Sequence, residues 1–192
     1  MNKILTTPDP RLRMKSKKVS EITPEIKKII QSMIALSLDW EKSHPHELSA
    51  AMAAPQIGEN VRIIILRNDL DNKNDTNFTV LINPEIVKAE GVLETDYEGC
   101  LSVPRVYGLI KRHSKIRVKA LLDTGEEVRF KISGGFARTI QHEIDHLNGI
   151  LFIDHIKNQT DAFFELDNKG NLQPLDYETE IKNNRELWGE DE

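Results

Sequence analysis

The sequence predicts an α+β domain, and three observations support this prediction. Its 192 residues, 39% of them hydrophobic, are enough for one full core, and no linker or internal repeat divides them. Apolar residues recur at helical spacing in two segments, 24–40 and 136–147. Segments with strand character lie between the two, including an alternating pair at 116–121 and 127–132. We therefore expect small antiparallel or mixed β-sheets packed around a central helix formed by the second of these segments.

Composition narrows the class of protein. The net charge is -5, and no sustained basic stripe indicates binding to DNA or other nucleic acid. No apolar run approaches the roughly 20 residues that span a bilayer. The first residues also lack the apolar core of a signal peptide. We expect one domain over residues 1–192, with a polar tail from about 176 to 192, no membrane partner and a cytoplasmic location.

The first helix has a clear beginning. Thr23 suits the N-cap, and Pro24 suits the first helical position, where its missing N–H costs nothing. The apolar stripe that follows predicts a helix to about Trp40.

Strands are predicted where β-branched residues cluster. Residues 61–66 form one such run, and residues 78–82 form another, which we expect to end at Asn83-Pro84. The alternating segments 116–121 and 127–132 flank the turn residues Asp123-Thr124-Gly125 and predict a hairpin. A second hairpin is expected within 163–175, around Asn168-Lys169-Gly170-Asn171.

The second helix carries the pattern His-Glu-x-x-His. Residues four apart lie on the same face of a helix, so His142 and His146 aim two imidazoles at one point. Two neutral imidazoles suit a divalent transition metal, and the adjacent Glu143 can accept a proton from water that the metal activates. The alternative is a helix with two surface histidines, and a third ligand is needed to decide.

The context of this helix favours a metal site. An apolar stripe of Phe136, Ile140, Ile144 and Leu147 predicts a buried face, and the two histidines lie off that stripe. Gly149 sits where helices commonly end in the left-handed conformation. The single cysteine, Cys100, rules out an intramolecular disulfide and is either a small buried hydrophobe or the thiolate that completes the site.

With these residues in view, the sequence resembles the peptide deformylase family over most of its length. Two motifs of the family are intact, Glu98-Gly99-Cys100-Leu101-Ser102 and the nine residues from Gln141 to Gly149. A third, Gly-x-Gly-x-Ala-Ala-x-Gln, corresponds to Ser49 through Gln56. Shorter matches occur at Pro8 to Arg13, Asn83-Pro84, Ala137-Arg138 and Leu151-Phe152-x-Asp154.

The resemblance implies an enzyme that hydrolyses the formyl amide of the N-terminal formylmethionine of newly synthesised proteins and releases formate. Cys100, His142 and His146 would bind one divalent metal, most often ferrous iron (Fe2+) and, in purified protein, also Ni2+, Co2+ or Zn2+. Glu143 would act as the general base and acid. The Gln56 side-chain amide and the Leu101 backbone N–H would stabilise the oxyanion.

Further roles follow from the same resemblance. Ser49, Ala50 and Ala51 would bind the substrate peptide as an added strand. Glu98 would support the substrate pocket or cap its own loop. Asp145 would pair with Arg112, the alternative being an exposed helix aspartate. Formylmethionyl nascent peptides are the implied partners, with the ribosome as a further candidate.

The departure from the family lies in the first motif, where Ser49 and Ala51 replace two glycines. Their Cβ atoms are expected to narrow the peptide groove or to strain its backbone. Two alternatives therefore stay open: a related metal-dependent amidase for another N-acyl peptide or small amide, and a non-catalytic metal-holding protein that binds peptide ends.

Overall fold

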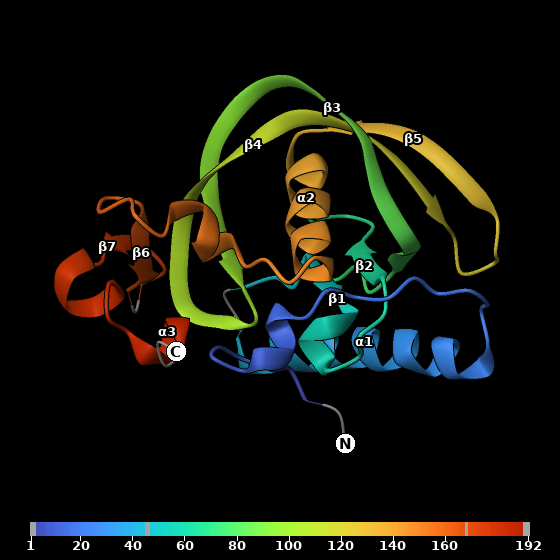
Figure 1. Cartoon of the computed structure of the whole chain (residues 1–192), viewed down its shortest axis with the longest axis horizontal. Coiled ribbons are helices and arrows are strands. Elements are labelled where there is room, and N and C mark those ends of the chain that lie inside the picture. The colour runs from blue at the N-terminus through green and yellow to red at the C-terminus, as the bar shows by residue number, and fades with distance from the viewer. Residues whose placement is uncertain (1–2, 45–46, 168, 190–192) are drawn as a thin grey trace.

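Two long strands form the frame of the fold in this computed structural model, which describes residues 3–44, 47–167 and 169–189. Strand β3 covers Phe78–Cys100, and after a two-residue turn β4 returns antiparallel to it over Val103–Leu121. Figure 1 shows this pair arching over helix α2, which covers Gly135–Leu147.

The seven strands found in the described residues belong to one sheet, in the order β1-β2-β3-β4-β6-β7, with β5 also paired to β4. Every strand pair is antiparallel. The shorter strands are β1 (Ala51–Ala53), β2 (Ile63–Arg67), β5 (Glu127–Ser133), β6 (Phe163–Leu166) and β7 (Leu172–Pro174). The expectation of several small sheets is corrected to one curved sheet.

The length of β3 is what joins the parts of this sheet. We expected a strand over 78–82 to end at Asn83-Pro84, and this was wrong, because β3 continues to Cys100. The pairing with β4 shifts register between Ile82 and Glu85, and Asn83 adopts a positive φ of 52°. Such a bulge accommodates a proline, which has no N–H to donate, and it bends the strand instead of ending it.

Helix α1 covers Pro24–Ser43 and begins as predicted, with the Thr23 hydroxyl accepting a hydrogen bond from the Ile26 N–H at 3.4 Å. The predicted hairpins also form, as β4–β5 and β6–β7, although Asn168 lies outside the described residues. The remaining helical elements are short: η1 (Pro10–Arg13), η2 (Ala54–Ile57), η3 (Phe152–Ile156), the π-helical η4 (Tyr177–Ile181) and α3 (Arg185–Trp188). Within the described residues, no helix is long and apolar enough to cross a membrane.

Helix α2 is fixed by its apolar face. Ile140, Ile144 and Leu147 are buried in one cluster with side chains from β1, β2, β3 and β4, as the apolar stripe predicted, whereas Phe136 at the start of the stripe is only half-buried. Burying such a side chain contributes about 1.5–3 kcal/mol. The rest of the helix surface carries buried polar side chains, including both histidines and Glu143. Apolar packing thus fixes the position of these polar groups beneath the arch.

The end of α2 generates a prediction about Gly149. Its φ of 76° is left-handed, as expected, and a Cβ there would lie 2.3 Å from the backbone oxygen of Arg13. Gly149→Ala should therefore lower stability by more than the roughly 1–2 kcal/mol of a left-handed alanine. Chemical unfolding measures the loss. Gly170→Ala is the control, because Gly170 has a φ of 80° but no atom within 4 Å of a Cβ; equal losses in both variants would contradict the packing argument.

Candidate metal centre

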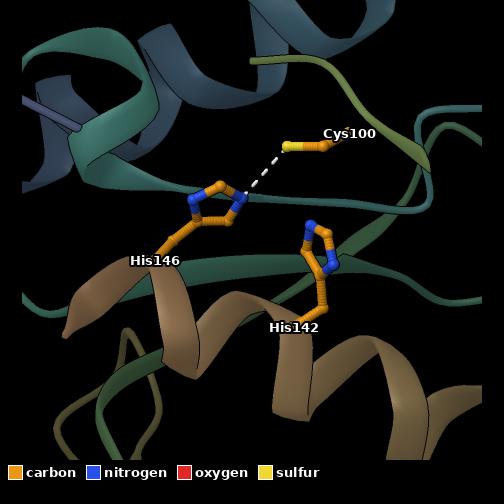
Figure 2. Close-up of side chains that lie close together, drawn as sticks. All are labelled: Cys100, His142 and His146. Atoms are coloured by element: carbon orange, nitrogen blue, oxygen red, sulfur yellow. Dashed lines mark hydrogen bonds between the residues drawn. The ribbon is translucent and has the colours of Figure 1, made fainter. Parts of the chain in front are cut away.

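Three side chains of the kinds that bind metals meet beneath the arch. Cys100 comes from the end of β3, and His142 and His146 come from successive turns of α2. One ligand atom of each lies within 4.8 Å of the others, and the Cys100 Sγ is 3.1 Å from the His146 Nε2. Figure 2 shows both imidazoles projecting from the helix on the side that faces Cys100. The structure brings together all three ligands that the sequence predicted.

Local features hold Cys100 at this point. It is the last residue of β3 before the turn, and the Ser102 N–H donates to its sulfur at 3.4 Å. The preceding Gly99 lies under the Tyr107 ring, where a Cβ would come within 2.6 Å of a ring carbon. Glycine at this position therefore lets the β4 strand pack closely beside the cysteine.

His142 is oriented from behind by Glu98. Its Nδ1 lies 2.9 Å from the Glu98 Oε2, which leaves Nε2 for the centre. Burial lowers the pKa of His142, but hydrogen bonds with Cys100 and Glu98 outweigh burial and raise this pKa well above 6.5. Cys100 and Glu98 thus favour positive charge at His142, and a cation that binds there would take the place of the His142 proton.

Unlike His142, His146 and Glu143 lie in surroundings that favour their neutral forms. Burial lowers the pKa of His146 well below 6.5, so its imidazole is neutral, as a metal ligand must be. Burial raises the pKa of Glu143 to about 7. The Glu143 Oε2 and the His146 Nδ1 are buried and have no hydrogen-bond partner among the described residues. The orphaned carboxylate oxygen is available to accept a proton from a molecule that enters the centre.

These residues fit a divalent transition metal. One thiolate and two imidazoles are a ligand set that such metals accept, and three protein ligands leave a fourth tetrahedral position open. Buried polar atoms normally have a hydrogen-bond partner, but the Glu143 oxygen beside these ligands has none among the described residues. A reactant activated by the metal would supply that partner. The cluster is therefore a possible metal site with a catalytic rather than a structural ligand number.

The Gln56 amide points at the same centre. Its oxygen accepts from the Ala53 N–H at 2.8 Å, which fixes the orientation of the amide. Its nitrogen donates to the Ser102 hydroxyl at 3.2 Å and lies 3.6 Å from the Cys100 sulfur. Leu101 occupies the turn directly after Cys100, so its backbone is also adjacent to the centre.

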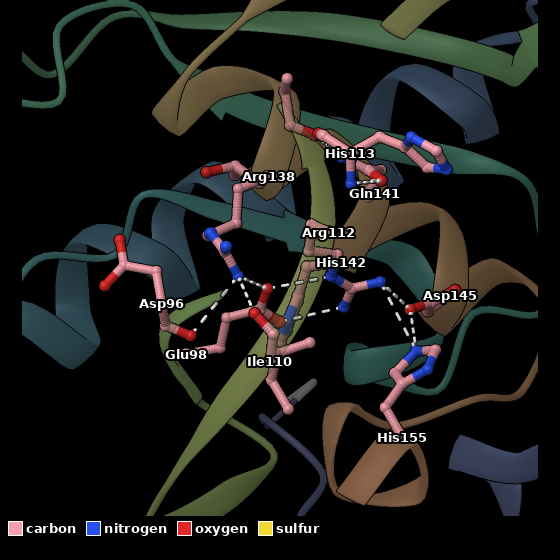
Figure 3. A network of polar contacts seen from close by, with 12 residues as sticks. Asp96, Glu98, Ile110, Arg112, His113, Arg138, Gln141, His142, Asp145 and His155 are labelled. Atoms are coloured by element: carbon pink, nitrogen blue, oxygen red, sulfur yellow. Dashed lines mark hydrogen bonds and ion pairs between the residues drawn. The ribbon is translucent and has the colours of Figure 1, made fainter. Parts of the chain in front are cut away.

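A buried ionic network supports the ligands (Figure 3). Arg112 of β4 donates to both oxygens of Glu98, at 2.9 and 3.0 Å, and its third nitrogen lies 2.5 Å from the Asp145 Oδ2 on α2. Arg112 therefore connects β3 to the helix that carries both histidines. Asp145 is not an exposed helix aspartate, because it pairs with Arg112 as one alternative predicted.

The structure adds two residues to this network, and a third beside Gln56, that sequence reasoning missed. Arg138 donates to the Glu98 Oε1 at 2.8 Å, and His155 lies 2.7 Å from the Asp145 Oδ2. Ser102 is fully buried and accepts from Gln56. Arg138 lies in one of the shorter matches to the family and Ser102 in an intact motif, and both matches were usable signals. His155 had none.

The residues predicted to bind substrate lie in two places, behind His142 and at one edge of the sheet. Glu98 is buried, and its Oε2 lies 2.9 Å from the His142 Nδ1. Ser49 is also buried, and its hydroxyl lies 2.6 Å from that of Ser37 on α1. Ala51 begins β1, the edge strand of the described sheet, and Ala50 directly precedes it.

Comparisons with known proteins point to one family. The family model described as Polypeptide deformylase matches residues 1–162. A peptide deformylase of Halothermothrix orenii is 44% identical over 150 residues, covering 77% of this chain and 88% of its own. One of Desulforudis audaxviator is 40% identical over 151 residues, covering 79% and 90%.

Solved structures show the same likeness. A peptide deformylase from Synechococcus elongatus in complex with actinonin has a TM-score of 0.70 and 36% identity, covering 82% of this chain and 80% of that one. One from Legionella pneumophila has a TM-score of 0.71 and 36% identity, covering 81% and 85%. The fold and the centre define a hydrolase that acts on a formyl amide bond. The chain belongs to the polypeptide deformylase family.

The position of Glu98 generates a prediction about metal affinity. Glu98→Gln keeps the shape of the side chain but weakens its hold on His142, so metal affinity should fall about 10–100-fold. Competition with a chelator measures the affinity. Glu90→Gln is the matched control, because Glu90 also pairs with an arginine from β4, Arg117, but at the surface. An unchanged affinity in Glu98→Gln would mean that Glu98 does not orient the ligand.

Proposed function

We propose that this protein removes the formyl group from the N-terminal formylmethionine of newly synthesised peptides and releases formate. One observation carries the proposal: in a chain of this family, Cys100, His142 and His146 meet beside a buried carboxylate and a fixed amide. Three ligands, a proton acceptor and a hydrogen-bond donor are what metal-assisted hydrolysis of an amide requires.

The ligands proposed for one divalent metal are Cys100, His142 and His146. Ferrous iron is the proposed metal, and Ni2+, Co2+ or Zn2+ are expected to replace it in purified protein, because the same donor set accepts all four. When bound, the metal supplies Lewis-acid polarisation of a carbonyl and lowers the pKa of a coordinated water from 15.7 to about 7.

Glu143 is the proposed general base. Its orphaned oxygen takes a proton from the attacking water as the water oxygen bonds to the formyl carbon, and it then delivers this proton to the leaving amine nitrogen. The carbon–nitrogen bond breaks, leaving formate and a free amino terminus. Such proton transfer typically contributes about 10²–10⁴-fold in rate.

The Gln56 amide and the Leu101 N–H are the proposed donors to the oxyanion that develops on the formyl oxygen. The Ala53 N–H already orients the Gln56 amide, whose nitrogen donates to Ser102 before a substrate binds. Loss of one such donor typically costs about 10²–10³-fold in kcat.

The free edge of β1 is the proposed peptide-binding surface. The Arg67 N–H donates to the Ala50 oxygen at 2.9 Å, so Ala50 faces β2. Because pairing alternates along an antiparallel strand, the N–H and C=O of Ala51 face the open edge. A substrate peptide can add there as a further strand, with its formyl end toward Gln56 and the ligands.

We also propose the extent of the domain, its location in the cell and the place where it meets its substrate. We propose one catalytic domain over 1–192 with α2 as its central metal-binding helix, because Ile181 and Leu187 of the tail lie in the same buried cluster as Leu5 and Leu12. A thiolate ligand and ferrous iron both require a reducing compartment, which supports the cytoplasm. Nascent substrates make the ribosome the proposed place of encounter.

Neither alternative function keeps a specific observation in its favour. An amidase for other acyl groups was suggested by Ser49 and Ala51, but the Ser49 hydroxyl is turned toward Ser37 and Ala51 is buried in the cluster with α2. A protein that only binds peptide ends would need neither the orphaned Glu143 oxygen nor the oriented Gln56 amide.

Formate release from formyl-Met-Ala-Ser by anaerobically purified protein, with metal counted on the same sample, tests the proposal. We expect fast release with about one metal per chain, as three ligands with one open position imply. Acetyl-Met-Ala-Ser is the comparison substrate. Faster release of acetate than of formate would favour the amidase, and no release of either by metal-loaded protein would favour the binding protein.

Two variants separate the proposed roles. Cys100→Ala should lose metal and activity together, because two histidines alone are a poor site. Glu143→Ala should keep its metal and lose about 10²–10⁴-fold in kcat. Full metal content in Cys100→Ala would remove Cys100 from the site, and wild-type turnover in Glu143→Ala would reject it as the base.

A further inference from the structure

The segment that leads into β1 is held by a buried ion pair. Arg67 ends β2 and is fully buried, and Glu41 lies on α1 with 8% of its surface exposed. The Arg67 Nη2 is 2.5 Å from the Glu41 Oε1. Charged side chains are almost never this deeply buried unless they are paired, so both residues are committed to this contact.

The ion pair holds the backbone of Ser49 on both sides. The Ser49 N–H donates to the same Glu41 oxygen at 2.8 Å, and the Ser49 C=O accepts from the Arg67 Nε at 3.3 Å. With its hydroxyl beside that of Ser37, every polar group of Ser49 is occupied by α1 or β2. The position of this residue is therefore fixed without any contribution from a substrate.

Arg67 extends the same anchor to a second loop. Its Nη1 donates to the backbone oxygens of Lys73 and Asp75, in the loop between β2 and β3. Its own N–H donates to the Ala50 oxygen at 2.9 Å. One side chain thus connects α1, the entry to β1 and the loop that follows β2.

The anchor determines which backbone groups of β1 remain for a peptide. Ser49 and Ala50 are bonded inward, so Ala51 is the first residue whose N–H and C=O both face the free edge. Beyond it, the Ala53 N–H is taken by the Gln56 oxygen, whose amide nitrogen points at Cys100. Ala51 is thus held between two fixed points, Ser49 and the Gln56 amide.

We infer that Glu41 and Arg67 are positioning residues for substrate: they fix the free edge of β1 in the register that pairs Ala51 with the peptide backbone. This inference rests on the proposed function. A buried ion pair is rarely the most stabilising choice, since apolar residues of similar volume often serve as well. The directional bonds from Glu41 and Arg67 to Ser49 are what an apolar pair cannot supply.

The test compares two substrates in two variants. Glu41→Gln removes the charge that holds the guanidinium, and the double variant Glu41→Met/Arg67→Met removes both charges and all their bonds to Ser49 while keeping an apolar filling. The substrates are formyl-Met-Ala-Ser and formylmethionine amide, which lacks the downstream backbone that an added strand would pair. Asp39→Asn is the matched control, a carboxylate on the same helix that is 70% exposed.

We expect both variants to raise KM for formyl-Met-Ala-Ser by at least about tenfold, equivalent to about 1.4 kcal/mol of binding. Turnover of formylmethionine amide, kcat for the tripeptide and metal content should stay within about twofold of wild type, because β1 pairing contributes to binding and not to the chemistry. The control should match wild type for both substrates.

Two outcomes would overturn the inference: an unchanged KM for the tripeptide in a folded double variant, or equal losses for both substrates. If Glu41→Gln does not fold, the double variant decides. Wild-type protein that releases no formate from either substrate would refute the proposed function instead.

Hydrogen exchange on the wild-type protein gives a readout that needs no variant. The Ser49 amide should be protected with and without peptide, because Glu41 holds it. The Ala51 amide should become protected only when the product peptide Met-Ala-Ser is added. An Ala51 amide with the same protection in both states would also overturn the inference.

Discussion

The buried carboxylate of Glu98 is the constraint on which the centre depends. A buried charge without partners is costly, and removing one partner from a buried pair typically costs about 3–5 kcal/mol. Hydrogen bonds from His142 and Arg112 outweigh burial and lower the pKa of Glu98 well below 4.5. The same bonds fix the ring of His142 and connect β3 to α2 through Arg112. Satisfying one charge therefore also sets the relative position of the two elements that carry the ligands.

The surroundings of the polar groups in the centre favour different charge states. His142 is surrounded by Cys100 and Glu98, which favour positive charge, whereas burial keeps His146 neutral. Burial is the main cause that raises the pKa of Glu143 to about 7, into the range where a carboxylate can both accept and donate a proton. A second buried ion pair, Glu41 with Arg67, acts on the other side of the sheet, where it fixes β1. Glu98 with Arg112 and Glu41 with Arg67 both make directional hydrogen bonds that fix the orientation of neighbouring groups, which apolar packing cannot do.

Local sequence signals predicted the elements whose causes are local. Thr23-Pro24 set the start of α1, turn residues set the β4–β5 hairpin, and Gly149 follows the end of α2. The continuation of β3 past Asn83-Pro84 was missed, because a bulge depends on the partner strand and not on the residues that form it. For the same reason, several small sheets were expected where one curved sheet forms.

The sequence by itself predicted the proposed ligands and the proposed base, because helical spacing places His142, Glu143 and His146 together and Cys100 lies in a specific motif of the family. It also paired Arg112 with Asp145 through the family resemblance. Only the tertiary structure decided that Glu98 faces His142 and that Ser49 is turned inward to Ser37, Glu41 and Arg67. Those contacts join residues from separate elements, and which side chains meet depends on how a bent sheet and two helices pack. The spacing of residues along the sequence does not predict that packing.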